Sequence, residues 1–141
     1  MSRPEPAELQ CICTTARMAS RVLSRLYDDA LRPFGLRTTQ LSILSRLEDE
    51  GPLGLTQLAA RLALERSTLT RDLAPLERRG LVRVAPGADR RQRVVELTAD
   101  GRATLEAAWP AWRAAQHDVR VRAGVERVER ALADLRALAA L

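Results

Sequence analysis

The sequence predicts a mainly helical protein that contains one small β-hairpin. Apolar residues recur at three- and four-residue steps over most of the 141-residue chain, which is typical of amphipathic helices. This period is interrupted once, between residues 81 and 97, by two short runs of strand character around a Pro-Gly turn. Only four residues are aromatic, so the core must be aliphatic. An aliphatic core suits packed helices better than a β-sandwich.

Four helices are expected before the hairpin, over residues 8–31, 38–48, 55–62 and 66–79. The first carries one apolar stripe from Leu9 to Ala30, and Pro33 with Gly35 should end it. Thr38 or Thr39 can cap the second helix, and Gly54 is a permissive cap for the third. Leu69, Leu73 and Leu76 form the buried stripe of the fourth.

Two strands and two more helices should complete the chain. The strands are expected over Leu81–Ala85 and Val94–Leu97. Thr98 then caps a helix to about His117, although Pro110 lacks an N–H group and must kink or interrupt it. A last helix from Val121 reaches the C-terminus. This organisation divides the chain into N-terminal scaffold helices (8–50), a helical lobe that ends in the hairpin (51–97) and C-terminal helices (98–141).

The positive charge is concentrated in one stretch of the chain. The sequence has 23 basic and 18 acidic residues, a net charge of +5, and every basic residue is Arg. Residues 61–93 contain nine Arg and four acids, whereas the rest of the chain is balanced. A localised excess of this kind favours an anionic partner such as double-stranded DNA.

Two helices joined by a short turn and followed by a hairpin with a basic tip form a winged helix-turn-helix. Its second helix can lie in the major groove while the hairpin, the wing, reaches across the phosphate backbone. Short hydroxyls and a bidentate Arg at the start of that helix can approach base edges, and Arg78 and Arg79 are better placed for phosphates. The predicted DNA-binding residues are Arg66, Ser67, Thr68, Thr70, Arg71, Arg78, Arg90, Arg91 and Arg93.

Several short segments in this order closely resemble the MarR family of transcriptional regulators. They are residues 58–62 (LAARL), 67–71 (STLTR), 76–82 (LERRGLV), 89–91 (DRR) and 97–101 (LTADG). The resemblance implies a homodimer held by the first helix and the last two, which presents two winged lobes to a pseudo-palindromic site. It also implies that Arg91 enters the minor groove and that Asp89 orients the wing arginines.

Cys11 and Cys13 lie near the start of the first helix, where a helix N-terminus and Arg17 would favour a thiolate. The organic-hydroperoxide-sensing branch of the same family is similar, with a reactive Cys in this region and a Tyr at the distance of Tyr27 from Cys13. That branch has a second Tyr where this chain has Arg17. The cysteines could therefore be redox sensors, ligands of a soft metal or sites of other thiol chemistry, or plain apolar residues.

Trp109, Trp112, Gln116 and His117 lie on the helix after the wing. They can pack the dimer core and the junction with the lobe. Alternatively, they can line a pocket for a small aromatic or acidic effector, as in related regulators.

The sequence predicts a cytoplasmic regulator, most simply a repressor that an effector or oxidant releases from DNA. No apolar run is long enough to cross a membrane, and the N-terminus lacks a signal peptide. With a single His and two nearby Cys, we expect no enzyme activity, cofactor or metal centre. The alternatives are a nonspecific architectural DNA-binding protein and, less favoured, a thiol-dependent enzyme.

Overall fold

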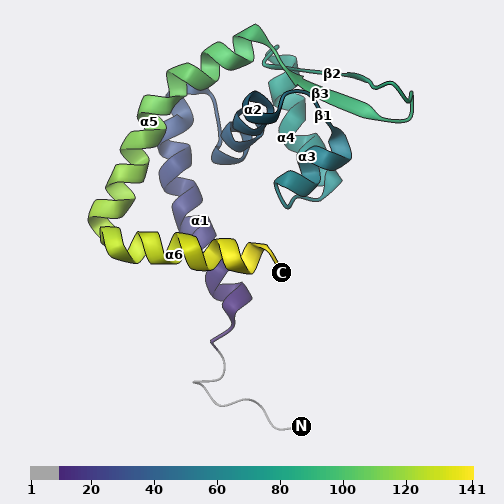
Figure 1. Cartoon of the computed structure of the whole chain (residues 1–141). Helices are drawn as coiled ribbons and strands as arrows, with labels where there is room; N and C mark the ends of the chain where they lie inside the picture. Colours follow the sequence, from purple (N-terminus) through teal and green to yellow (C-terminus); the bar gives the residue numbers. More distant parts are fainter. Residues whose placement is uncertain (1–9) are drawn as a thin grey trace, which may run out of the picture.

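The computed structural model describes residues 10–141 and confirms a mainly α fold with a β-hairpin (Figure 1). A winged lobe lies on one side of a frame made by α1, α5 and α6, in which the C-terminal half of α1 packs against α5. The elements in order are α1 (Ile12–Leu31), a 3-10 turn η1 (Arg32–Phe34), α2 (Thr38–Glu50), β1 (Leu53–Gly54), α3 (Leu55–Arg61), α4 (Arg66–Arg78), β2 (Val82–Pro86), β3 (Arg93–Leu97), α5 (Ala99–Ala123) and α6 (Val125–Ala139).

The first helix begins at Ile12 in the described part of the chain, and its expected start near Glu8 and Leu9 lies outside that part. Its predicted end is confirmed. Pro33 occupies the first turn of η1, where its missing N–H costs nothing, and Gly35 closes the turn at φ +64°.

The predicted caps of α2 are wrong, because Thr38 and Thr39 lie inside its first turn and Arg37 is the N-cap. Other side chains accept the backbone N–H groups at the start of α2. The Asp28 carboxylate accepts the Thr38 N–H at 2.7 Å, and the buried Gln40 side chain accepts the Arg37 N–H at 3.0 Å. Capping from α1, which is remote in sequence, replaces the expected hydroxyl cap.

The leucine stripe of α4 is buried as predicted, and Pro75 lies inside this helix without ending it. The sheet has three antiparallel strands in the order β1-β3-β2. Strand β1 was not predicted, because Leu53 and Gly54 are too few to show a period; they pair with Val95 and Val94 of β3. The hairpin itself runs from Val82 paired with Leu97 to Pro86 paired with Arg93.

The helix after the wing is longer than expected. Helix α5 continues through Pro110 to Ala123, so its predicted end near His117 is wrong and Val121 belongs to α5 rather than to the last helix. Proline removes one helical hydrogen bond, which leaves a bend, visible in Figure 1, rather than a break. The break falls at Gly124, whose φ of +95° starts α6.

The start of α5 is locked against the wing lobe. The Thr98 hydroxyl donates to the Gly80 carbonyl at 2.6 Å and accepts the Gly101 N–H at 3.0 Å, so the predicted Thr98 cap is confirmed. A Cβ on Gly101 would lie 2.0 Å from the Leu81 carbonyl oxygen, so only glycine fits there.

A single leucine-rich core joins the lobe to the frame. Its fully buried members come from α1, α2, α3, α4, the sheet and α5, and include Leu31, Leu44, Leu58, Leu69, Val95 and Leu105. Within residues 10–141, no helix has the length and apolar character needed to span a bilayer. The same residues contain no group of three or more side chains placed to hold a metal ion.

Candidate nucleic-acid interface

One face of α4 is turned to solvent and carries most of the residues that were predicted to read DNA. Arg66, Ser67, Thr70 and Arg71 are exposed, and Leu69 between them is buried. Thr68 is only half-buried, so it lies at the edge of this face. The helix begins after Glu65, whose side chain makes no capping hydrogen bond to the first turn of α4.

The Thr70 hydroxyl is already used inside the helix, because it donates to the Arg66 carbonyl oxygen at 2.8 Å. Its oxygen can still accept a hydrogen bond, for example from an adenine or cytosine amino group. Ser67 makes no such bond among the described residues, so its hydroxyl can donate or accept.

The wing ends in a short ordered loop between Pro86 and Arg93. The Gly87 N–H donates to the Gln92 carbonyl at 2.8 Å, and the Gln92 N–H donates to the Asp89 carbonyl at 2.9 Å. The Asp89 carboxylate accepts the Arg91 N–H at 3.1 Å. Asp89 therefore positions the backbone of Arg91 and forms no ion pair with a wing guanidinium among the described residues.

The nine arginines between residues 61 and 93 divide into two groups. Three are engaged by the protein itself: Arg61 pairs with Glu50 at 3.0 Å, Arg83 pairs with Glu96 at 2.5 Å, and Arg79 donates to the Gly35 and Phe34 carbonyls at 2.7 and 3.0 Å. The guanidinium of Arg79 thus holds the turn after α1, and its expected contact with a phosphate stays a prediction. The other six have no ion pair within residues 10–141, and they are Arg66, Arg71, Arg78, Arg90, Arg91 and Arg93.

Two cavities are lined jointly by α4 and the wing. One of about 430 Å³ lies between the start of α3, Arg66 and the wing residues Arg91 and Arg93. A second of about 400 Å³ places Arg78 and Thr70 of α4 beside Arg93. The first cavity also contains residues that sequence reasoning missed, namely Thr56, Gln57 and Gln92. The sequence did contain a signal that fixes the position of Gln57. It stands three residues after the N-cap Gly54, the position of a capping-box glutamine, and its side-chain oxygen accepts the Gly54 N–H at 3.2 Å.

The three predicted sensor residues are not brought together within one protomer. Cys11 and Cys13 are exposed at the start of α1, and Tyr27 lies fourteen residues later, about 21 Å along the same helix. Hydrogen bonds from the Thr14 side chain and backbone hold the pKa of Cys11 below its ordinary value. Tyr27 donates to the Gln116 side-chain oxygen on α5, and burial raises its pKa, with the charge of Arg120 opposing the shift.

The predicted effector residues separate into two places. Trp109 and Trp112 pack edge to face, with ring centroids 5.3 Å apart, and line a cavity of about 260 Å³ against α2. Gln116 points to Tyr27 instead, and His117 is exposed. The structure thus supports a common pocket for the two tryptophans only.

This chain is a winged helix-turn-helix protein. A short turn joins α3 to α4, a three-stranded wing follows, and six exposed arginines without an ion pair lie on α4 and the wing. Comparison with known proteins then places it in a family. Residues 36–92 match the sequence model of the MarR family. The chain is 46% identical to the Mycobacterium tuberculosis transcriptional regulator MosR, solved in complex with DNA, with 92% of this chain and 96% of MosR aligned and a TM-score of 0.79.

Two further relatives agree. The overoxidized form of AbfR bound to DNA is 30% identical over 88% of this chain and 91% of AbfR, with a TM-score of 0.69. The HTH-type transcriptional regulator YwoH of Bacillus subtilis is 32% identical over 62% of this chain, and the match spans 64% of YwoH, slightly less than two thirds of its length. The chain belongs to the MarR family of transcriptional regulators, as its motifs predicted.

Proposed function

We propose that this protein is a sequence-specific DNA-binding repressor that acts as a homodimer on a pseudo-palindromic operator. The observation that carries the proposal is the division of the arginines between residues 61 and 93. The six that the protein does not use internally all lie on α4 or the wing and are exposed, and four of them line the two cavities between these elements. Guanidinium groups without internal partners, next to short hydroxyls, suit a surface that reads base edges and phosphates.

The relatives support DNA as the partner. MosR, at 46% identity, and AbfR, at 30%, have both been solved bound to DNA. In the proposed complex, Ser67, Thr70 and Arg71 face the major groove. Arg91 enters the minor groove, and Arg66, Arg78, Arg90 and Arg93 neutralise phosphates.

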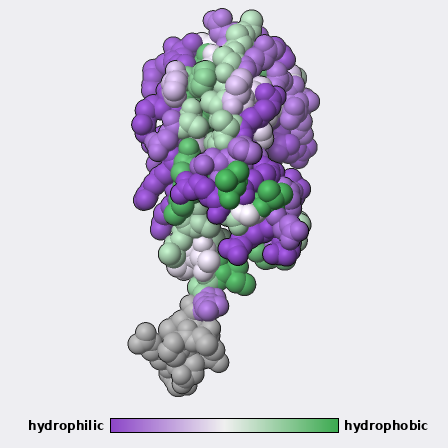
Figure 2. Space-filling view, turned by 90° about the vertical axis from the view of Figure 1, so that its left-hand side faces the viewer, coloured by the Kyte–Doolittle hydropathy of each residue, from purple (hydrophilic) through white to green (hydrophobic). Residues whose placement is uncertain are grey.

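Exposed apolar side chains on the frame support the dimer. Ile12, Met18, Val121 and Val125 are each more than half exposed, and Leu135 and Leu138 are nearly so. Figure 2 shows hydrophobic side chains emerging among hydrophilic ones at the level of α6 and on the projecting end of α1. Exposed apolar side chains gathered on neighbouring helices are typical of a surface that a second subunit covers.

We further propose that a small-molecule effector or thiol oxidation releases the operator. The exposed cysteines lie on the part of α1 that a partner would cover, so a change there alters how the two lobes are spaced. Attack of a thiolate on a hydroperoxide breaks its O–O bond, leaving a sulfenic acid and releasing the corresponding alcohol. Hydroperoxide should then weaken DNA binding, and Cys13→Ser should abolish the response. An unchanged affinity of the wild-type protein after treatment contradicts oxidation sensing.

The proposal of sequence-specific binding is tested by comparing two duplexes. The first carries an inverted repeat selected by the protein from a random pool, and the second has the same bases in scrambled order. A specific regulator should prefer the repeat by about 10³-fold or more at physiological salt. Equal affinity would support the architectural alternative, in which only the phosphate backbone is bound.

A further inference from the structure

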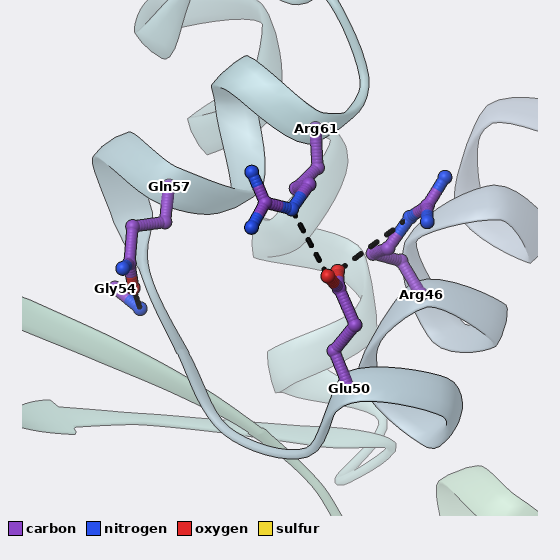
Figure 3. A network of polar contacts seen from close by, with 5 residues as sticks. All are labelled: Arg46, Glu50, Gly54, Gln57 and Arg61. Carbon is purple, nitrogen blue, oxygen red and sulfur yellow. Dashed lines mark hydrogen bonds and ion pairs between the residues drawn. The ribbon is translucent and has the colours of Figure 1, made fainter.

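Two arginines of the helix-turn-helix contact residues outside it. Arg61 of α3 pairs with Glu50 of α2, with 3.0 Å between its Nε and the carboxylate Oε1 (Figure 3). Arg79 is the C-cap of α4, and its Nη1 and Nη2 groups donate to the Gly35 and Phe34 carbonyl oxygens at 2.7 and 3.0 Å. These carbonyls lie at the end of the turn η1, which follows α1 directly, so Arg79 joins α4 to the frame.

Both ends of this contact are rigid. Each of the two helical segments ends in the Schellman pattern, in which a glycine with positive φ and the residue after it donate their N–H groups back to the last turn. The donors are Gly35 and Leu36 after η1, and Gly80 and Leu81 after α4, at 2.9 to 3.4 Å. Leu36 and Leu81 are each only 3% exposed, so both turns are anchored in the core. Arg79 therefore connects two fixed points of the protein.

The geometry of the turn suits a guanidinium group. The hydrogen bonds that close the turn use the Leu31 and Arg32 carbonyls, which leaves the Phe34 and Gly35 carbonyls for another donor. Carbonyls at a helix C-terminus carry partial negative charge, and the planar fork of an arginine can donate to two of them at once. A Cβ on Gly35 would lie 2.9 Å from Nη1 of Arg79, so the glycine also leaves the space that the guanidinium occupies.

The contact lies at the opposite end of α4 from the residues proposed to read bases. Arg71 is eight residues before Arg79, which is about 12 Å along the helix. A tilt of about 5° around the C-terminal end of α4 would therefore move Arg71 by about 1 Å. Good hydrogen bonds vary in length over only about 0.5 Å, so a small tilt is enough to lose a bidentate contact with a base.

We propose that Arg79 is a positioning residue, which fixes the angle of α4 relative to α1 and thereby determines how the base-reading residues enter the major groove. It acts through the helix and does not touch DNA. Helix α1 also carries exposed apolar residues assigned to the dimer surface, so Arg79 connects α4 to the helix that sets the spacing of the two lobes. The effect on recognition rests on the proposed function, whereas the attachment of α4 to η1 does not.

The salt dependence of DNA binding separates positioning from a phosphate contact. The full-length wild type, Arg79→Ala and Arg78→Ala are titrated with the inverted repeat and the scrambled duplex at several salt concentrations. Arg79→Ala should bind the repeat about tenfold more weakly, the equivalent of one base contact, with an unchanged salt slope and unchanged affinity for scrambled DNA. Arg78→Ala should weaken binding to both duplexes and reduce the slope by about one. The positioning role is overturned if Arg79→Ala behaves like Arg78→Ala or like the wild type.

Three further variants test the geometry of the contact. Arg79→Lys keeps the charge but loses the planar fork, so it should resemble Arg79→Ala; wild-type behaviour would indicate a phosphate contact and overturn the proposal. Gly35→Ala should also lower the preference for the repeat, because its Cβ displaces the guanidinium. Gly51→Ala is the matched control, since Gly51 also has a positive φ, +77°, but its Cβ would meet nothing within 4 Å. The proposal is overturned if Gly35→Ala prefers the repeat as strongly as Gly51→Ala does.

Amide hydrogen exchange without DNA tests the attachment alone. Residues 31–37 should exchange faster in Arg79→Ala than in the wild type, whereas Arg78→Ala should leave their exchange unchanged. Unchanged exchange in Arg79→Ala overturns the attachment, whatever the DNA measurements give. Faster exchange in Arg79→Ala, together with a wild type that binds the repeat no better than scrambled DNA, overturns the repressor function and leaves the attachment in place.

Discussion

Replacing Gly101 with alanine should destabilise the joint between the wing lobe and α5. The added Cβ would lie 2.0 Å from the Leu81 carbonyl oxygen, whereas Cβ atoms do not approach closer than 3.0 Å, so the two segments must separate by at least 1.0 Å. The same oxygen accepts the Thr98 N–H at 3.1 Å, and a shift of this size breaks that bond. Overpacking costs about 1–3 kcal/mol and the lost hydrogen bond about 1 kcal/mol, so we expect a loss of about 2–4 kcal/mol.

Thermal or urea unfolding at one fixed protein concentration measures this loss, because the stability of a dimer depends on concentration. For a chain of this length the melting temperature should fall by about 10 °C. Gly54→Ala is the matched control, since its Cβ would meet the nearest described atom, Gln57 Oε1, at 3.4 Å, an ordinary contact. If Gly101→Ala unfolds together with Gly54→Ala and wild type, the close approach of α5 to the Leu81 backbone is not a real constraint.

Three further predictions concern the DNA-facing residues and Tyr27. Arg91→Ala should lower operator affinity and reduce the slope of log affinity against log salt concentration by about one. The control Arg136→Ala on α6 should not change the slope. Equal slopes for wild type and Arg91→Ala would refute a position of Arg91 close to the phosphates. Arg71→Ala should cost about 1–3 kcal/mol on the operator and much less on random DNA, so equal losses on both would exclude base recognition. Burial raises the pKa of Tyr27 above its ordinary 10.0, so its stabilising contribution is present below pH 10 and is lost as the pH rises further. Tyrosinate absorbance of this single tyrosine should appear at higher pH in the folded than in the denatured protein, and coincident midpoints would contradict its burial.

The parts of the fold that follow from local chemistry were predictable from sequence. The periodic stripe of Leu69, Leu73 and Leu76, the capping of the Gly101 N–H by Thr98 and the hairpin around residues 86–89 each depend on neighbours within a few positions. The parts set by remote contacts were not. Strand β1 exists because β3 offers Leu53 a partner, and α2 is capped by Asp28, ten residues upstream.

The candidate site shows the same division. The six arginines in the predicted set of DNA-binding residues are all exposed, since the buried leucine stripe and the hairpin tip determine which way they face. Arg79 could not be separated from Arg78 by sequence, because its acceptors are carbonyl oxygens 44 and 45 residues away. Likewise, helical spacing places Gln116 one turn after Trp112, but the hydroxyl of Tyr27 draws it to α1 and away from the tryptophan pocket.

The central claim is that two copies of the lobe present α4 and the wing to one face of duplex DNA. Hydroxyl-radical footprinting on a selected inverted repeat tests it most directly. The account predicts two protected half-sites with centres about 10 base pairs apart, each with a flanking minor-groove contact that disappears in Arg91→Ala. Uniform protection along the duplex, or a single protected site that Arg91→Ala leaves unchanged, would contradict it.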